Sequence, residues 1–321
     1  MENNKRDATI DILRIVASIL VISIHTTSSM IAMTIGRWAV PFFMVVTGYF
    51  YFNNPNHDKL IKIVKNLLSL WLIWMIIYIP NAIIHIQGMS ISKAIHALVW
   101  AIIGDSIFFD GSWYLPAAAF GIWVTDYFRK HCKMVVCNIL ALVLLFVGCV
   151  ASSYDNLNLG ILSKMHWATT FPMGVIWMTL AFYISKYQKQ LKTKLKWSGW
   201  IILAMLLTIF EHIFTLKFGF CSLVNRSDMY FTLPISILIL FAFIFNHPHY
   251  QSKEKTLWFR NFATLLFFTQ FYVITFVKAF VHIKLSILKF IIVLVVSSAI
   301  SLIILWISNK KHFSILKKIY E

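Results

Sequence analysis

Apolar runs long enough to cross a membrane recur along this chain from residue 10 to residue 307. A helix needs about 20 predominantly apolar residues to cross the hydrocarbon core of a bilayer. Backbone groups inside that core must bond to one another, and alternating strands of barrel length are absent, so we expect helices. Only 13% of the residues are charged, whereas soluble domains average about 25%. The sequence therefore predicts a protein whose solvent is lipid.

The apolar runs divide into ten expected spans, which form an all-α, polytopic transmembrane helix bundle. We expect one integral membrane domain over residues 1–321 and no soluble domain. The predicted spans are 10–31, 38–53, 66–86, 112–128, 134–151, 166–185, 197–216, 229–246, 258–279 and 286–307. A further apolar piece over residues 94–109, which contains Gly104 and Asp105, is short for a span. We interpret it as an interfacial or re-entrant helix, and an eleventh span is the alternative.

The basic residues orient the predicted bundle. With the N-terminus in the cytoplasm, 20 of the 29 Lys and Arg residues fall in cytoplasmic segments and 7 in outer segments. Such an excess of positive charge in cytoplasmic loops is typical of membrane proteins. We therefore expect an N-in/C-in, multi-pass protein of the cell membrane. The net charge of +17 is then a topology signal, so the predicted partner is the lipid bilayer and not nucleic acid. The four cysteines show no paired metal-ligand spacing, and we expect no metal.

Arg14 and His25 are polar residues within the first predicted span. Eleven residues at ~100° each bring them onto one helix face, roughly 16 Å apart along the axis. An arginine near the cytoplasmic side can hold a phosphate or a carboxylate with two parallel hydrogen bonds. A neutral histidine deeper in the span can take a proton from an attacking hydroxyl. The structural alternative is that Arg14 extends to the interface and that His25 bonds a neighbouring carbonyl.

Two further groups carry candidate chemistry. Glu211, in the outer half of the seventh span, could orient a base or relay a proton. His212 follows it, but adjacent helical residues point ~100° apart and should not pair; the alternative is a polar pair near the outer interface. Lysines on successive turns before the third span could contact the phosphates of a nucleotide-containing donor, or could simply anchor the helix. These lysines are Lys59, Lys62 and Lys65.

Five segments follow one another in an order that is known from other proteins. An Arg, ten residues and a His span residues 14–25, and Pro-Phe-Phe-Met-Val-Val-Thr-Gly-Tyr-Phe occupies 41–50. A basic turn followed by Trp and Tyr covers 59–78, Gly-Ser-Trp-Tyr-Leu-Pro-Ala covers 111–117, and Phe-Pro-Met-Gly covers 171–174. Together these segments resemble the membrane-bound acyltransferase family 3. They are most similar to the membrane half of vancomycin-resistance serine racemases.

The resemblance implies an integral membrane O-acyltransferase. It would move an acyl group, most simply acetyl, from acyl-CoA to a hydroxyl of a cell-surface glycan, a lipid-linked sugar or another envelope molecule. His25 would be the general base or a transient acyl carrier, and Arg14 would position the donor. The implied binding residues are Lys59, Lys62, Lys65, Trp113 and Glu211. Acyl-CoA is expected as a co-substrate, with no bound cofactor.

Two features depart from the family. Members often have Tyr-x-x-His in a late helix, where this chain has Leu-Phe-Phe-Thr-Gln-Phe-Tyr at 266–272, and the third helix commonly uses Arg where this chain has Lys. Without a soluble racemase domain, we expect no racemase activity. A serine-like small-molecule transporter is the main alternative, in which Arg14 would bind a carboxylate and Glu211 or His25 would carry a proton. A scaffolding protein would leave the shared face of Arg14 and His25 unexplained.

Overall fold

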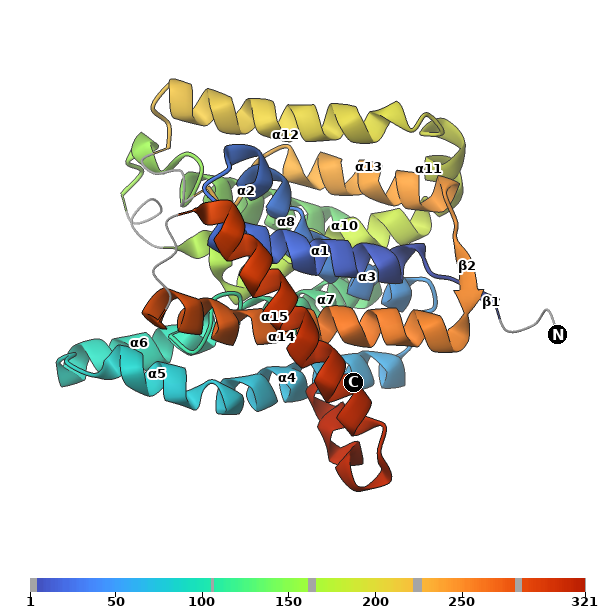
Figure 1. Cartoon of the computed structure of the whole chain (residues 1–321). Helices are drawn as coiled ribbons and strands as arrows, with labels where there is room; N and C mark the ends of the chain where they lie inside the picture. Colours follow the sequence, from blue (N-terminus) through green and yellow to red (C-terminus); the bar gives the residue numbers. More distant parts are fainter. Residues whose placement is uncertain (1–4, 105–106, 161–165, 222–226, 281–284, 321) are drawn as a thin grey trace.

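The computed structural model describes residues 5–104, 107–160, 166–221, 227–280 and 285–320. Most helices lie side by side along one direction and form a bundle (Figure 1). Asp105 of the predicted interfacial piece lies outside the described residues. So do three basic residues that were assigned to outer segments, namely Lys164, Arg226 and Lys284.

The first half of the chain builds one short strand and eight helices. In order these are β1 (Lys5–Asp7), α1 (Thr9–Thr26), α2 (Met30–Gly36), α3 (Ala39–Phe52), α4 (His57–Ile77), α5 (Ile79–Ile86), α6 (Ile91–Ile103), α7 (Tyr114–His131) and α8 (Met134–Val150). Helix α1 begins where the Asp7 carboxylate accepts the backbone N–H of Thr9 at 2.9 Å. Helix α4 ends before Pro80, which stands at the start of α5 and cannot continue a helix from the preceding turn.

The second half is again mostly helical. Its elements are η1 (Asp155–Leu157), η2 (Trp167–Thr169), η3 (Phe171–Met173), α10 (Gly174–Lys186), α11 (Gln188–Lys194), α12 (Gly199–Lys217), α13 (Leu233–Asn246), β2 (Tyr250–Ser252), α14 (Lys253–Phe280), α15 (Ser286–Ser308) and η5 (Lys311–Ile319). Strands β1 and β2 pair antiparallel, so a three-residue ribbon is a small exception to the all-α prediction.

Small residues allow the central helices to cross closely. A Cβ on Gly174 at the start of α10 would lie 1.8 Å from the carbonyl oxygen of Ala117 in α7. A Cβ on Gly121 would lie 2.3 Å from the carbonyl oxygen of Gly174. Close backbone approach through glycine and alanine is a common way to pack helices in membranes. The Phe-Pro-Met-Gly segment at 171–174 thus ends on the residue that this crossing requires.

Helix α1 lies in the middle of the bundle and packs along α14, with α2, α3 and α15 also against it. The hydroxyl of Ser18 donates to the carbonyl of Ala263 in α14 at 2.8 Å. This bond stabilises a polar group that is fully buried on α1. The packing places the end of α1, and therefore His25, beside the end of α14.

Among the described residues, six segments are long and apolar enough to cross a membrane, which confirms a multi-pass helical membrane protein. They are Thr9–Thr26, Met30–Phe52, His57–Ile77, Gly199–Lys217, Lys253–Phe280 and Ser286–Ser308. Helix α6, with 13 residues, is shorter than the ~20 that a span needs. Helices α5 and α6 form a hairpin that projects from one end of the bundle (Figure 1). The count of ten spans and the N-in/C-in orientation stay predictions.

The C-terminal part differs from the regular bundle. Helix α15 runs obliquely across its neighbours, and the segment after it turns back toward α4 (Figure 1). The indole N–H of Trp74 in α4 donates to the carbonyl of Ile319 at 2.9 Å. The third predicted span also begins earlier than expected, because α4 starts at His57 and so includes the lysine turns.

Candidate active site

A cavity of about 750 Å³ lies at the end of the bundle where α1 finishes. Its wall combines the ends of α1 and α14, the α2–α3 junction, α5, α6, and the segments before α7 and α13. The α5–α6 hairpin contributes His85 and Trp100 to this wall. We call this end of the molecule the cavity end, and the end that holds Lys59, Lys62 and Lys65 the lysine end.

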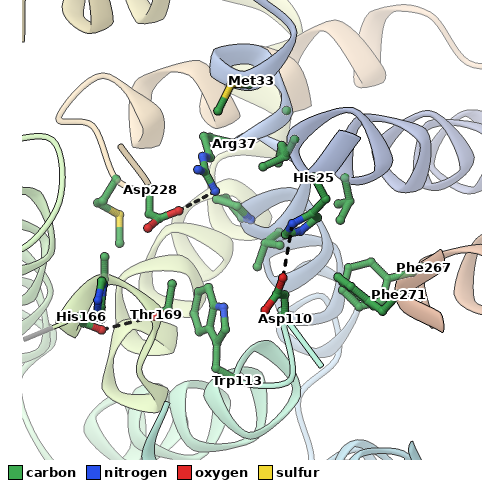
Figure 2. A pocket seen from close by; sticks show the side chains of 18 of the residues that line it. His25, Met33, Arg37, Asp110, Trp113, His166, Thr169, Asp228, Phe267 and Phe271 are labelled. Carbon is green, nitrogen blue, oxygen red and sulfur yellow. Dashed lines mark hydrogen bonds and ion pairs between the residues drawn. The ribbon is translucent and has the colours of Figure 1, made fainter. Parts of the chain in front are cut away.

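His25 stands in the last turn of α1 and faces the cavity (Figure 2). Its Nδ1 lies 3.6 Å from Oδ2 of Asp110, which comes from the segment before α7. That separation is longer than a direct hydrogen bond, but it is short enough for the carboxylate to stabilise a positive charge on the imidazole. On its other side, His25 meets the ring of Phe271 edge-on at 5.3 Å. The imidazole can therefore accept a proton next to a carboxylate.

Arg37 and Asp228 form a second pair on the wall of the same cavity (Figure 2). Arg37 follows α2, Asp228 lies before α13, and a guanidinium nitrogen is 2.5 Å from Oδ1 of Asp228. The two side chains are only 15% and 22% exposed. Burial raises the pKa of Asp228 above the usual aspartate value, and the positive charge of Arg37 opposes that rise. The pair joins two parts of the chain that are far apart in sequence.

The structure brings two of the predicted site residues, His25 and Trp113, to this cavity. Trp113 is nearly buried and points into the cavity across from Arg37 (Figure 2). Arg14 lies three turns before His25 on α1 and is not among the residues that line the cavity. A guanidinium nitrogen of Arg14 is 2.8 Å from a carboxylate oxygen of Asp11, one turn away on the same helix.

The remaining predicted site residues lie elsewhere. Glu211 is buried in α12, and its carboxylate accepts hydrogen bonds at the start of α13. It faces a second, separate hollow beside Tyr154 and Phe231. At the lysine end, the amino group of Lys59 donates to the carbonyl of Phe50 at 2.5 Å. Lys62 and Lys65 are exposed on α4.

Sequence reasoning missed several ionisable residues of the cavity, which stand outside the predicted spans or at their very ends. They are Arg37, Asp110, His166, Asp228 and Lys278. A signal was present for two of them. Arg37 stands four residues before the Pro-Phe-Phe segment, and Asp110 directly precedes the Gly-Ser-Trp-Tyr-Leu-Pro-Ala segment. Nothing in the sequence pointed to Asp228, because its partner Arg37 stands almost 200 residues earlier in the chain.

Comparison with known proteins concerns the chain as a whole. The family model of an acyltransferase domain, acyltransferase family 3, matches residues 7–306. An amino-acid racemase of Enterococcus faecalis is 25% identical over 95% of this chain and 47% of its own length. A serine/alanine racemase of Enterococcus gallinarum is 23% identical over 78% of this chain and 39% of its own length. The chain thus spans less than half the length of these two relatives. No solved structure gives a significant match.

Proposed function

This chain belongs to acyltransferase family 3, and on that premise we propose that it is an O-acyltransferase of the cell membrane. It takes an acyl group, in the simplest case acetyl, from acyl-CoA on the cytoplasmic side. It passes that group to a hydroxyl of a cell-surface glycan or a related envelope molecule. The proposal includes the ten-span, N-in/C-in topology, which places the lysine end in the cytoplasm and the cavity end outside.

The observation that carries this proposal is the position of His25 in a cavity of about 750 Å³ with Asp110 beside it. In the proposed step the acceptor hydroxyl attacks the thioester carbonyl, so that a C–O bond forms and the C–S bond breaks. His25 takes the hydroxyl proton and then gives it to the departing CoA thiolate. Asp110 stabilises the protonated imidazole between these two transfers.

The donor is proposed to arrive from the lysine end. There the exposed Lys62 and Lys65 supply positive charge that suits the phosphates of CoA. Arg14, whose charge is balanced by Asp11, is proposed to position the donor at the start of α1. Arg14 and His25 are separated by roughly 16 Å along α1, so the extended arm of the donor would follow the first helix toward the cavity. This route assigns Lys59 a smaller part, because its amino group already contacts carbonyls at the end of α3.

The test uses purified protein in nanodiscs and acetyl-CoA that carries radiolabel in the acetyl group. We expect His25→Ala to lower label transfer by about 10²–10⁴-fold, because a positioned base contributes that much. Circular dichroism should show an unchanged helix content. His96→Ala, on α6 and outside the cavity lining, is the matched control and should keep wild-type turnover. Full turnover by His25→Ala would refute the mechanism.

A serine-like transporter is the second candidate, because the relatives are named as amino-acid and serine/alanine racemases and the cavity offers both charge signs. In this case Arg14 or Arg37 would bind the substrate carboxylate. Uptake of labelled serine into proteoliposomes, lost in Arg14→Ala or Arg37→Ala, would favour transport. Movement of label from acetyl-CoA with no serine uptake would favour acyl transfer.

A further inference from the structure

The Arg37–Asp228 pair has no part in the proton transfer assigned to His25, yet it occupies the opposite side of the same cavity (Figure 2). The pair carries no net charge, and it presents a planar N–H donor group next to carboxylate acceptors. Most of each side chain is buried, so its polar atoms are held in place. Trp113 lines the same cavity and points into it from across the space (Figure 2).

The segment that carries Asp228 is held firmly from two sides. The carbonyl of Met229 accepts the hydroxyl of Ser153 at 2.6 Å, and the Met229 N–H donates to the hydroxyl of Ser152 at 3.1 Å. Tyr230 is fully buried, and its hydroxyl makes a short hydrogen bond with Nδ1 of His212 in α12. Residues directly after Asp228 are thus fixed to the end of α8 and to α12.

Glu211 completes this attachment. Its two carboxylate oxygens accept the backbone N–H groups of Phe231 and Thr232, each at 2.8 Å. The hydroxyl of Tyr154 donates to the same carboxylate at 3.0 Å. A carboxylate at the start of a helix also interacts favourably with the helix dipole of α13. Glu211 therefore fixes the start of α13 and, through it, the position of Asp228 relative to Arg37.

We propose that Arg37, Asp228 and Trp113 form the subsite that binds a sugar ring of the acceptor, and that Glu211 is a positioning residue for this subsite. The proposal rests on the proposed function and assigns the residues that hold its acceptor. Sugar hydroxyls both donate and accept, so they match a neutral pair of donor and acceptor groups. The apolar face of a sugar ring suits the indole of Trp113.

The size and charge of the cavity argue against two other ligands. A volume of about 750 Å³ is in the range that encloses ligands of drug size, which is more than one small amino acid fills. The cavity lining holds two carboxylates, Asp110 and Asp228, and two cations, Arg37 and Lys278, so it offers a free anion no excess of positive charge. A neutral polyhydroxylated group needs no such excess and uses both members of the Arg37–Asp228 pair.

The test measures binding without any acyl chemistry. Saturation-transfer NMR on the full chain in nanodiscs would use two probes, methyl β-glucopyranoside and the methyl glycoside of N-acetylglucosamine. We expect a signal from at least one glycoside with the wild type. Asp228→Asn should weaken it by about 10- to 100-fold, because hydrogen bonds to a charged group contribute about 1.5–3 kcal/mol. Glu211→Gln should weaken it by a smaller factor, and Glu211→Asp should restore part of the loss.

Glu254→Gln is the matched control, because Glu254 is exposed at the start of α14 and should bind the glycosides like wild type. With the glycoside that binds as acetyl acceptor, a positioning role predicts that Glu211→Gln raises the KM for this glycoside more than it lowers kcat. A loss of folding would instead lower the helix content and the thermal midpoint. Failure of both glycosides to bind wild type, or equal binding by Asp228→Asn and wild type, would overturn the proposal.

Two further outcomes separate this proposal from the function on which it rests. Hydrolysis of acetyl-CoA that depends on His25, with no glycoside binding, would leave the acyltransferase and remove the sugar subsite. Glycoside binding that depends on Asp228, with no acyl chemistry, would support the subsite and remove the acyltransferase. Displacement of the glycosides by millimolar L-serine would overturn the sugar assignment, since an amino acid would then be the ligand of this pair.

Discussion

The two ends of the bundle use the same kinds of charged residue in different ways. At the lysine end, each buried carboxylate is paired with a basic residue one turn away on its own helix. Asp11 pairs with Arg14 at 2.8 Å. Asp126, which is almost fully buried, pairs with Arg129 at 2.7 Å and with Lys130 at 2.6 Å. These local pairs neutralise charge within single helices.

At the cavity end the pairs join distant parts of the chain. Asp110 reaches His25 from the segment before α7, and Asp228 reaches Arg37 from the segment before α13. Each of these pairs lines open space, whereas neither local pair does so in the described cavity. The comparison indicates that local pairs stabilise the ends of α1 and α7, while long-range pairs line the cavity.

The comparison predicts that an Asp→Asn substitution affects mainly stability at the lysine end and mainly activity at the cavity end. Asp126→Asn, at the lysine end, leaves two cations without their carboxylate. Breaking a buried pair costs about 3–5 kcal/mol, but the side chains of Arg129 and Lys130 are 25% and 33% exposed and remain partly solvated. We therefore expect a loss of about 1–3 kcal/mol in unfolding free energy. Denaturant titration in detergent micelles measures it.

The activity of Asp126→Asn should stay unchanged per folded molecule, because Asp126 lies far from the cavity lining. Acetyl transfer would be normalised to the folded fraction from the same preparation. Lost activity together with unchanged stability would show that the lysine end takes part in the reaction through Asp126.

Asp110→Asn, at the cavity end, should leave stability nearly unchanged and lower the transfer rate. Asp110 is 59% exposed, so its stability contribution is small and the unfolding free energy should change by less than about 0.5 kcal/mol. An exposed charge pair contributes up to about 1 kcal/mol, which corresponds to roughly a fivefold fall in transfer rate. The rate would be measured with acetyl-CoA at saturation. A rate equal to wild type would remove Asp110 from the mechanism.

The pairs at the lysine end follow a local pattern in the sequence, whereas the pairs at the cavity end do not. A pair at i and i+3, such as Asp11 and Arg14, is visible in the sequence because helical geometry puts both residues on one side. The apolar runs likewise predicted the helices, since each satisfies its backbone alone. His25 and Trp113 were found through the span pattern and the family resemblance.

Long-range pairs depend on which helix ends meet, and no local pattern encodes that. Arg37 and Asp228 come together only because α2 and the start of α13 both pack at the end of α12. Glu211 was predicted to bind substrate, a role that no comparison tests, and its observed contacts fix the start of α13. A buried carboxylate in an apolar helix indicates a partner, but the sequence does not say whether that partner is a ligand or a backbone.

The smallest predicted difference lies within the lysine end itself. The amino group of Lys59 donates to the carbonyls of Phe50 and Asn54, at 2.5 and 3.2 Å, and so closes the end of α3. Because Lys59 is partly exposed, Lys59→Ala should cost about 0.5–1 kcal/mol in unfolding free energy. Lys62→Ala, at an exposed position one turn later, should stay within about 0.5 kcal/mol of wild type.

The same pair of variants sharpens the assignment of donor binding. If Lys62 attracts the phosphates of CoA, Lys62→Ala should raise the KM for acetyl-CoA while stability and kcat stay unchanged. Added salt should reduce the difference from wild type, because exposed charges are screened within about 10 Å at 0.1 M ionic strength. An unchanged KM at low salt would mean that this lysine anchors α4 at the membrane surface. The cavity end would then hold all of the chemistry.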